Sequence, residues 1–170
     1  GLGDVYKRQT PHFAISEDSL KRAMEKFEIT QDKPIIALCA GAEFGPSKRW
    51  PQEYFADVAK QKLAAGYQVF LFGSKNDLPI CDHIQKACND ACVNLCGKTS
   101  LAEAIDLLSI AKAAVSNDSG LMHIAAAQNM PVVAVYGSTS PDFTPPLGEK
   151  AEIVKLNLEC QPCFKRCLLY

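Results

Sequence analysis

The turn Asp118-Ser119-Gly120 combines residue types that suit anion binding. It follows a buried apolar run and opens a short helical pattern. The first backbone N–H groups of a helix have no partner inside it, and together with the helix dipole they attract phosphate or another anion. Asp118 or Ser119 can cap this helix, and Gly120 lets a ligand approach the backbone closely. The turn is therefore a candidate anion site, although an ordinary capped helix start would use the same residues.

Two basic side chains could serve the same anion. Lys48 precedes a predicted helix, in a loop with two Gly and two Pro, GAEFGPSKRWP. A lysine and a helix N-terminus that converge on one anion suit a diphosphate, whereas a solvated lysine is the ordinary alternative. His123 lies one turn after Gly120 and can point back at the same place, although a structural role is as common for such a histidine. The Walker loop and the Gly-x-Ser-x-Gly pattern of serine hydrolases are both absent.

The elements that must position these residues alternate along the chain. Strand-like apolar runs occupy 35–40, 68–73, 92–95, 113–117, 132–136 and, more weakly, 152–156. Such continuous apolar runs, separated by helices, predict a parallel sheet covered on both faces. The predicted fold is α/β, a Rossmann-like doubly wound domain. Ligands of such a sheet bind beyond the carboxyl ends of its strands, where the loops of Lys48 and Asp118 both lie.

Helical spacing appears between the predicted strands. The predicted helices are 16–27, 52–65, 78–89, 101–111 and the short one after Gly120. Ser16 and Ser100 stand at helix starts and are predicted caps. In 101–111, the spacing predicts that Leu101, Ile105 and Leu108 face the core.

The composition limits the classes of protein to which this chain can belong. The chain of 170 residues is 48% hydrophobic and 22% charged, with a formal net charge of −1. Near-neutral charge argues against a nucleic-acid-binding surface, because phosphate backbones require a basic face. No apolar run approaches the length that spans a membrane. These totals suit one globular domain, or one half of a larger enzyme.

The chain contains eight cysteines, three of them in a terminal cluster. An α/β chain of this kind does not need disulfides, so we interpret the thiols as reduced and the compartment as cytoplasmic. Cys160, Cys163 and Cys167 have the spacing of zinc or iron–sulfur ligands, but no fourth ligand is evident. We therefore expect no metal, and a metal-binding redox protein stays a minor alternative.

Five motifs in order resemble one enzyme family. They are GAEFGPSKRWP, YQVFLFGS, LCGKTSL, NDSGLMHIAAA and YGSTSPDFTPPL, within residues 34–147. Together they resemble the C-terminal half of the ADP-heptose:lipopolysaccharide heptosyltransferases of glycosyltransferase family 9, which have the GT-B fold. The resemblance implies a transferase that inverts the sugar linkage, needs no cofactor or structural metal, and takes ADP-heptose as its donor. It also implies that the catalytic base and the acceptor site lie in an N-terminal half.

The resemblance carries roles to individual residues. Lys48 corresponds to the diphosphate contact, and the turn Asp118-Ser119-Gly120, with His123 beside it, corresponds to the site of the phosphates and sugar. Thr99 falls where the family places adenine. Ala42, Glu43 and Phe44 would line the phosphate side. Some relatives have a Glu for the ribose hydroxyls where Lys75 stands here, and Asp77 could substitute for it.

The implied partners are an ADP-sugar and, through the N-terminal half, the lipopolysaccharide inner core. The implied location is the cytoplasm, with peripheral association at the inner membrane left open. We interpret 1–9 as a non-native leader, 10–33 as interdomain linker and helix, 34–159 as the ADP-sugar-binding domain and 160–170 as a truncated tail. The closing CLLY also resembles adaptor sequence. A nucleotide-binding or interaction module of the same fold, without transferase activity, is the alternative.

Overall fold

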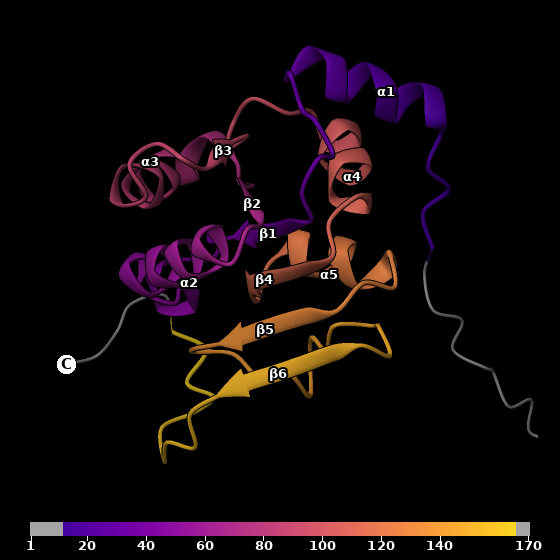
Figure 1. Ribbon diagram of the computed structural model, residues 1–170. Coiled ribbons are helices and arrows are strands. Elements are labelled where there is room, and N and C mark those ends of the chain that lie inside the picture. The colour runs from indigo at the N-terminus through magenta and orange to yellow at the C-terminus, as the bar shows by residue number, and fades with distance from the viewer. Residues whose placement is uncertain (1–11, 166–170) are drawn as a thin grey trace, which may run out of the picture.

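The computed structural model describes residues 12–165 and contains one six-stranded parallel sheet (Figure 1). Its strand order is β3-β2-β1-β4-β5-β6. The strands are β1 (Ile35–Cys39), β2 (Gln68–Leu71), β3 (Val93–Asn94), β4 (Ala113–Asn117), β5 (Val132–Tyr136) and β6 (Ala151–Lys155). The predicted α/β, doubly wound sheet is confirmed, including its weakest strand, β6. The leader 1–9, the closing CLLY and Cys167 lie outside the described residues.

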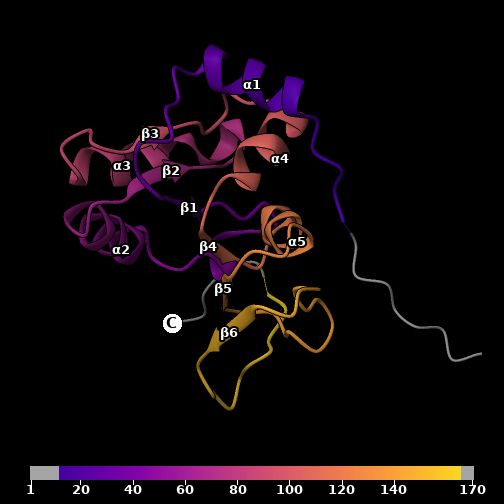
Figure 2. The same cartoon turned by 45° about the vertical axis from the view of Figure 1, so that its right-hand side comes forward.

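Helices cover both faces of the sheet (Figures 1 and 2). One face carries α2 (Gln52–Ala64) and α3 (Leu78–Ala87), whose buried side chains form one core cluster with the sheet. The other face carries α1 (Glu17–Lys26), α4 (Leu101–Ser109) and α5 (Gly120–Ala127), which form the second cluster. Short 3-10 helices η1 (Pro46–Lys48) and η2 (Lys75–Asp77) follow β1 and β2. The continuous apolar strands thus have helices on both sides, as their composition requires.

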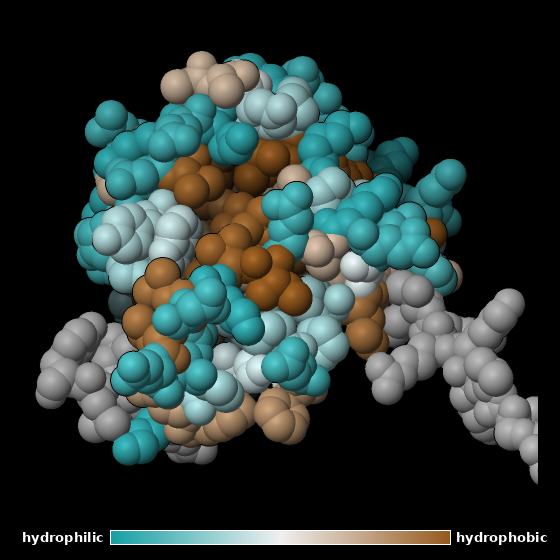
Figure 3. Space-filling view, turned by 90° about the horizontal axis from the view of Figure 1, so that it is seen from below, coloured by the Kyte–Doolittle hydropathy of each residue, from teal (hydrophilic) through white to brown (hydrophobic). Residues whose placement is uncertain are grey.

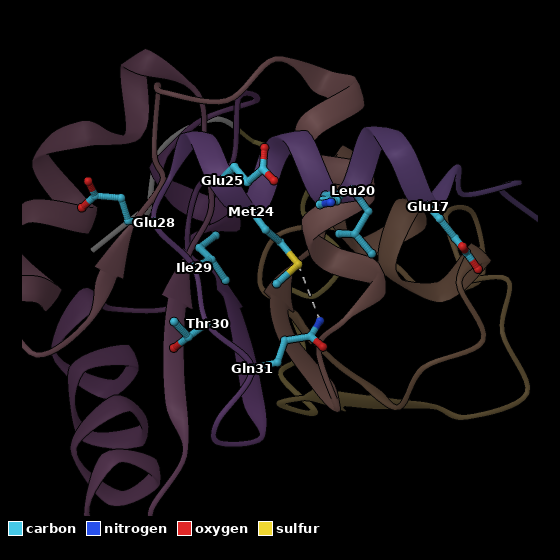
Figure 4. Close-up of a pocket in the computed structure, with 9 residues that line it drawn as sticks. Glu17, Leu20, Met24, Glu25, Glu28, Ile29, Thr30 and Gln31 are labelled. Carbon is cyan, nitrogen blue, oxygen red and sulfur yellow. Dashed lines mark hydrogen bonds between the residues drawn. The ribbon is translucent and has the colours of Figure 1, made fainter.

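The helix assigned to the linker packs on the domain. Ala23 of α1 is buried in the second core cluster, and Lys26 forms an ion pair with Glu103 of α4 at 2.7 Å. The α1 helix therefore lies beside α4 (Figures 1 and 2). A pocket of about 590 Å³ lies along α1 and the turn after it; Met24, Ile29 and Gln31 are among its lining residues (Figure 4). Because this turn leads into the start of β1, the pocket lies at the amino-terminal ends of the strands. The candidate site lies at their carboxyl-terminal ends.

The predicted core face of α4 is wrong at its first residue. Leu101 is 65% exposed and Ile105 is half-buried, whereas Leu108 is buried as predicted. The other buried positions of the helix are Ala104, Asp106 and Leu107. Leu101 is the first helical residue, between Ser100 and Glu103 of the capping box, so it lies at the exposed end of the helix. Ser100 caps α4 as predicted, whereas Ser16 precedes α1 without a side-chain cap bond.

β6 is the edge strand and is largely exposed. Ile153, Val154 and Leu156 are exposed apolar residues on or just after it. Viewed from the β6 side, the surface has hydrophobic atoms in a hollow at its centre (Figure 3). Burial along the sheet is therefore deepest in β1 and β2, and it decreases towards β6.

We predict that Leu107→Ala lowers the free energy of unfolding by about 2–5 kcal/mol, because the side chain is fully buried between α4 and the sheet. The matched control is Leu101→Ala, in the same helix and with the same side chain lost, which should change it by less than about 0.5 kcal/mol. Urea unfolding followed by circular dichroism measures both. Equal losses for the two variants would contradict the described orientation of α4.

Candidate active site

The centre of the site is an ion pair between two predicted residues. Lys48 Nζ lies 2.7 Å from Asp118 Oδ2. The Lys48 side chain is 16% exposed and that of Asp118 only 3%. Lys48 ends η1, after β1, and Asp118 follows β4, the neighbour of β1 in the sheet. Because these two strands are parallel neighbours, the loops that follow them both lie at the carboxyl-terminal end of the strands, which we call the carboxyl edge of the sheet.

Two hydroxyl groups complete the surroundings of Asp118. Thr139 donates a hydrogen bond to Asp118 Oδ2 at 2.6 Å, and Thr144 donates one to Oδ1 at 3.4 Å. Tyr136 fixes this loop, because its hydroxyl donates to the carbonyl oxygen of Thr144 at 2.6 Å. Burial, and next the negative charge of Asp118, raise the pKa of Tyr136, so it stays a neutral donor. None of these three residues was predicted to be part of the site, although all lie in the motif YGSTSPDFTPPL.

The predicted capping of α5 is wrong. Ser119 occupies the N-cap position but makes no side-chain cap bond, and its hydroxyl lies 3.3 Å from that of Ser116. The acceptors of Asp118 are used by Lys48 and by the threonines. Asp118 therefore joins two loops, and no side chain in residues 12–165 caps the start of α5. Apart from its chain neighbours and its own helix, a Cβ at Gly120 would meet no atom of the described residues within 4 Å.

A second set of contacts joins the loops after β1 and β5. Ser138 N–H donates to the carbonyl oxygen of Ser47 at 3.1 Å, and the two side-chain hydroxyls lie 3.0 Å apart. Gly137 makes this approach possible, because a Cβ there would overlap the Ser47 carbonyl oxygen. Ser47 and Ser138 are buried, and each directly precedes a partner of Asp118. This contact fixes the separation between Lys48 and Thr139.

Asn117 ties the end of β4 to the loop of Lys48. Its Nδ2 donates to the carbonyl oxygen of Ala40 at 2.7 Å, and its Oδ1 accepts from Trp50 N–H at 2.8 Å. The side chain is fully buried, so both bonds hold the loop without competition from water. A polar residue at the end of an otherwise apolar run was the available sequence signal.

Of the remaining predicted site residues, some lie beside the Lys48–Asp118 pair and others have no bond to it. The ring of exposed Phe44 lies 5.2 Å from Lys48 Nζ, within cation–π range. Ala42 is buried, whereas Glu43 is exposed. Thr99 and His123 are half-buried and, within residues 12–165, have no hydrogen bond or ion pair with Lys48 or Asp118. Thr99 follows β3, which is at the far edge of the sheet.

Asp77 holds the loop after β2. Its carboxylate accepts from Ser74 N–H at 2.9 Å and from the Ser74 hydroxyl at 2.7 Å, and Arg49 Nη2 lies 3.4 Å away. A Cβ on Gly41 would overlap this carboxylate, so the loops after β1 and β2 are in close contact. Lys75 is exposed beside it. The structure thus gives Asp77 a structural role, and a ribose contact by either residue stays a prediction.

The tail after β6 returns to the same edge. Phe164 N–H donates to the carbonyl oxygen of Ser138 at 2.8 Å, and Gln161 Nε2 donates to that of Gly137 at 2.7 Å. The Ser47 hydroxyl donates to the carbonyl oxygen of Lys165. The described part of the tail therefore packs on the loops of the site.

Comparison with known proteins now identifies the family. A family model for glycosyltransferase family 9 (heptosyltransferase) matches residues 2–169. The chain belongs to this family. It is 47% identical over 150 residues to lipopolysaccharide heptosyltransferase 2 of Escherichia coli K12, covering 86% of this chain and 43% of that protein. It is also 47% identical to lipooligosaccharide heptosyltransferase 2 of Haemophilus influenzae, over 86% of this chain and 44% of that protein.

Solved structures of family members agree. The E. coli ADP-heptose lps heptosyltransferase II superposes with a TM-score of 0.80 at 46% identity, over 86% of this chain and 45% of that one. A glycosyltransferase family 9 protein from Veillonella parvula gives a TM-score of 0.79 at 28% identity, over 87% and 43%. These neighbours have the GT-B fold. The glycosyltransferase chain described here spans less than half the length of the curated relatives it matches.

The cysteines of this family 9 chain are mostly core residues. Cys39, Cys81, Cys88, Cys92 and Cys96 are buried free thiols. Burial raises the pKa of Cys39 to about 12, so it is a neutral thiol and a poor metal ligand. Within residues 12–165, no group of His, Cys, Asp or Glu side chains has a metal-binding arrangement. In the same range, no helix is long and apolar enough to cross a membrane.

We predict that Gly137→Ala lowers the free energy of unfolding by about 1–3 kcal/mol, because the methyl group pushes the backbone of Ser47 away and breaks the Ser138–Ser47 bond. The control is Gly120→Ala, which adds the same methyl group in open space and should leave stability within about 0.5 kcal/mol of the parent. Thermal and urea unfolding measure both. An unchanged Gly137→Ala variant would show that the two loops are not tightly joined.

Proposed function

We propose that this chain is the ADP-heptose-binding part of a heptosyltransferase that adds heptose to the inner core of lipopolysaccharide. The observation that carries the proposal is the Lys48–Asp118 pair beside the open start of α5, at the carboxyl edge of the sheet. Family membership and the ADP-heptose named for the E. coli relative support the identity of the sugar nucleotide.

The geometry supports a diphosphate at this edge. A lysine ammonium has three N–H donors, and one of those of Lys48 is used by Asp118, so others remain for phosphate oxygens. The first N–H groups of α5 have no partner within the helix, and its dipole attracts negative charge. Gly120 has no neighbour where a side chain would stand, which leaves space for the ligand. These three features support the binding of a diphosphate from two sides, by Lys48 and by the start of α5.

The order of the strands suggests where the other parts of the donor lie. We propose that the sugar lies by Ser119, Gly120 and His123, while adenine lies towards Thr99 on the β3 side. Ala42, Glu43 and Phe44 then border the phosphates from the loop after β1. Lys75 or Asp77 would meet the ribose.

The transfer step needs groups that these residues do not include. We propose that the base that activates the acceptor hydroxyl belongs to the N-terminal half of a GT-B enzyme, and that the reaction inverts the anomeric centre. Lys48 and the start of α5 would stabilise the charge that develops on the ADP leaving group. This chemistry requires no metal ion. We propose that the whole enzyme is cytoplasmic and, because its acceptor is part of a membrane lipid, that it works at the cytoplasmic face of the inner membrane.

We predict that Lys48→Ala weakens ADP binding by about 1.5–3 kcal/mol, the usual loss for a hydrogen bond to a charged group. Adenosine, which lacks the diphosphate, should bind the variant and the parent equally. Isothermal titration calorimetry with both ligands measures the difference.

The matched control for this experiment is Lys112→Ala. Lys112 is exposed and directly precedes β4, at the opposite edge of the sheet, so its removal changes the net charge equally but not the site. ADP affinity should be unchanged in the control. If Lys48→Ala bound ADP like the parent, or lost adenosine to the same extent, the diphosphate would not be at Lys48.

We predict that Gly120→Val weakens ADP binding by more than about 1.4 kcal/mol, a factor of ten, while the protein stays folded. The Cβ of the added side chain meets no described atom outside its own helix and chain neighbours, so there is room for the side chain in the space that we assign to the ligand. Thermal unfolding tests the fold, and the same titration tests binding. Normal ADP affinity in a folded variant would move the site away from this turn.

A further inference from the structure

We propose that Thr139 is a positioning residue for the diphosphate site: it holds the buried carboxylate of Asp118 so that Lys48 can turn towards the phosphates. This inference rests on the proposed function, because it assumes that the ligand of Lys48 is a diphosphate. The role is indirect, since Thr139 acts on Lys48 through Asp118.

The contacts of Asp118 Oδ2 give Thr139 this role. The same oxygen accepts both the Lys48 ammonium at 2.7 Å and the Thr139 hydroxyl at 2.6 Å. Asp118 and Thr139 are both buried, at 3% and 5% exposure, so water does not replace either contact. Any ligand that competes for Lys48 therefore changes the surroundings of a carboxylate that is out of contact with solvent.

The physical reason is the cost of an unpaired buried carboxylate. When a diphosphate draws Lys48 towards itself, the ion pair between Lys48 and Asp118 weakens. Within the described residues, Asp118 has no other ion-pair partner. A buried charge without a donor is strongly unfavourable, whereas one with a short hydroxyl bond is much less so. Without Thr139, the remaining hydroxyl is that of Thr144, whose contact is long at 3.4 Å. Asp118 would then retain Lys48 more firmly, and the diphosphate would bind more weakly.

Thr139 is held firmly enough to act in this way. Its neighbour Ser138 bonds to Ser47 through both main chain and side chain, and Ser47 is the neighbour of Lys48. On the other side, Ser138 accepts a bond from the Phe164 N–H of the tail. The two adjacent residue pairs, 47–48 and 138–139, thus approach Asp118 as one unit.

A direct contact with the ligand is the competing explanation. Thr139 also lines a pocket of about 470 Å³ between the loop after β5 and the segment after β6, together with Ser140, Lys155 and Asn157. A hydroxyl in that position could touch a sugar or phosphate itself. The two explanations differ in whether the effect of Thr139 depends on Lys48.

The experiment measures ADP and adenosine affinity by calorimetry for Thr139→Val and Thr139→Ser. Val keeps the shape of Thr and removes the hydroxyl, so we expect ADP to bind about tenfold more weakly, with adenosine unchanged. Ser keeps the hydroxyl and should restore most of the ADP affinity. A Val variant with parental ADP affinity, or a Ser variant as weak as Val, would overturn the inference.

A double-mutant cycle with Lys48→Ala separates the two explanations. If Thr139 acts through Lys48, adding Thr139→Val to Lys48→Ala should change ADP affinity by less than about twofold. A further tenfold loss in the double variant would instead show direct ligand contact and overturn the positioning role. If Lys48→Ala alone left ADP binding unchanged, the proposed function would fail. If Lys48→Ala weakened ADP while Thr139→Val did not, only this inference would fail.

Discussion

The interaction on which the site depends is the buried pairing of Asp118 with Lys48. A carboxylate that is 3% exposed must be satisfied by donors from the protein, and here they come from the loops after β1 and β5. Each of those loops is in turn bonded to the other through Ser47 and Ser138. The requirement to satisfy one charge therefore fixes the positions of three chain segments that are far apart in the sequence. A solvated aspartate would impose no such constraint.

The sheet topology makes this arrangement possible. In the order β3-β2-β1-β4-β5-β6, the connections run in one direction from β1 and in the other from β4. At such a switch point the loops after the two adjacent strands separate to opposite faces and leave a crevice between them. Lys48 follows β1 and Asp118 follows β4, so their pairing bridges this crevice, and Thr139 reaches it from the next strand, β5. The pair thus lies where an open α/β sheet binds ligands.

Much of this could be predicted from the sequence, because the signals are local. Continuous apolar runs gave the strands, and loops that follow parallel strands must share an edge, which brought Lys48 and Asp118 together. The partners of Asp118 could not be predicted, since a capping aspartate and an ion-paired one look alike before the loop after β5 is placed. The prediction that Leu101 faces the core was wrong for a related reason. Helical spacing identifies which side of a helix faces the core, but not where the covering sheet ends. The packing of the tail on Ser138 depends on contacts between distant segments, and no local pattern indicates it.

The contacts among the site residues affect how a site of this kind binds and releases its ligand. Short bonds join Lys48 and Thr139 to Asp118, and the start of α5 lies at the same edge of the sheet. A lysine held by a buried carboxylate loses little further freedom when a diphosphate arrives, so less of the binding energy is spent on ordering it. In the proposed function, Asp118 also moderates the charge of Lys48, which limits how tightly the released ADP is retained. An electrostatic site that is ordered before the ligand binds needs only the turn of Lys48 towards the phosphates to stabilise a leaving group. If the proposed function holds, the Asp118 contacts that orient Lys48 for the donor also favour release of the product.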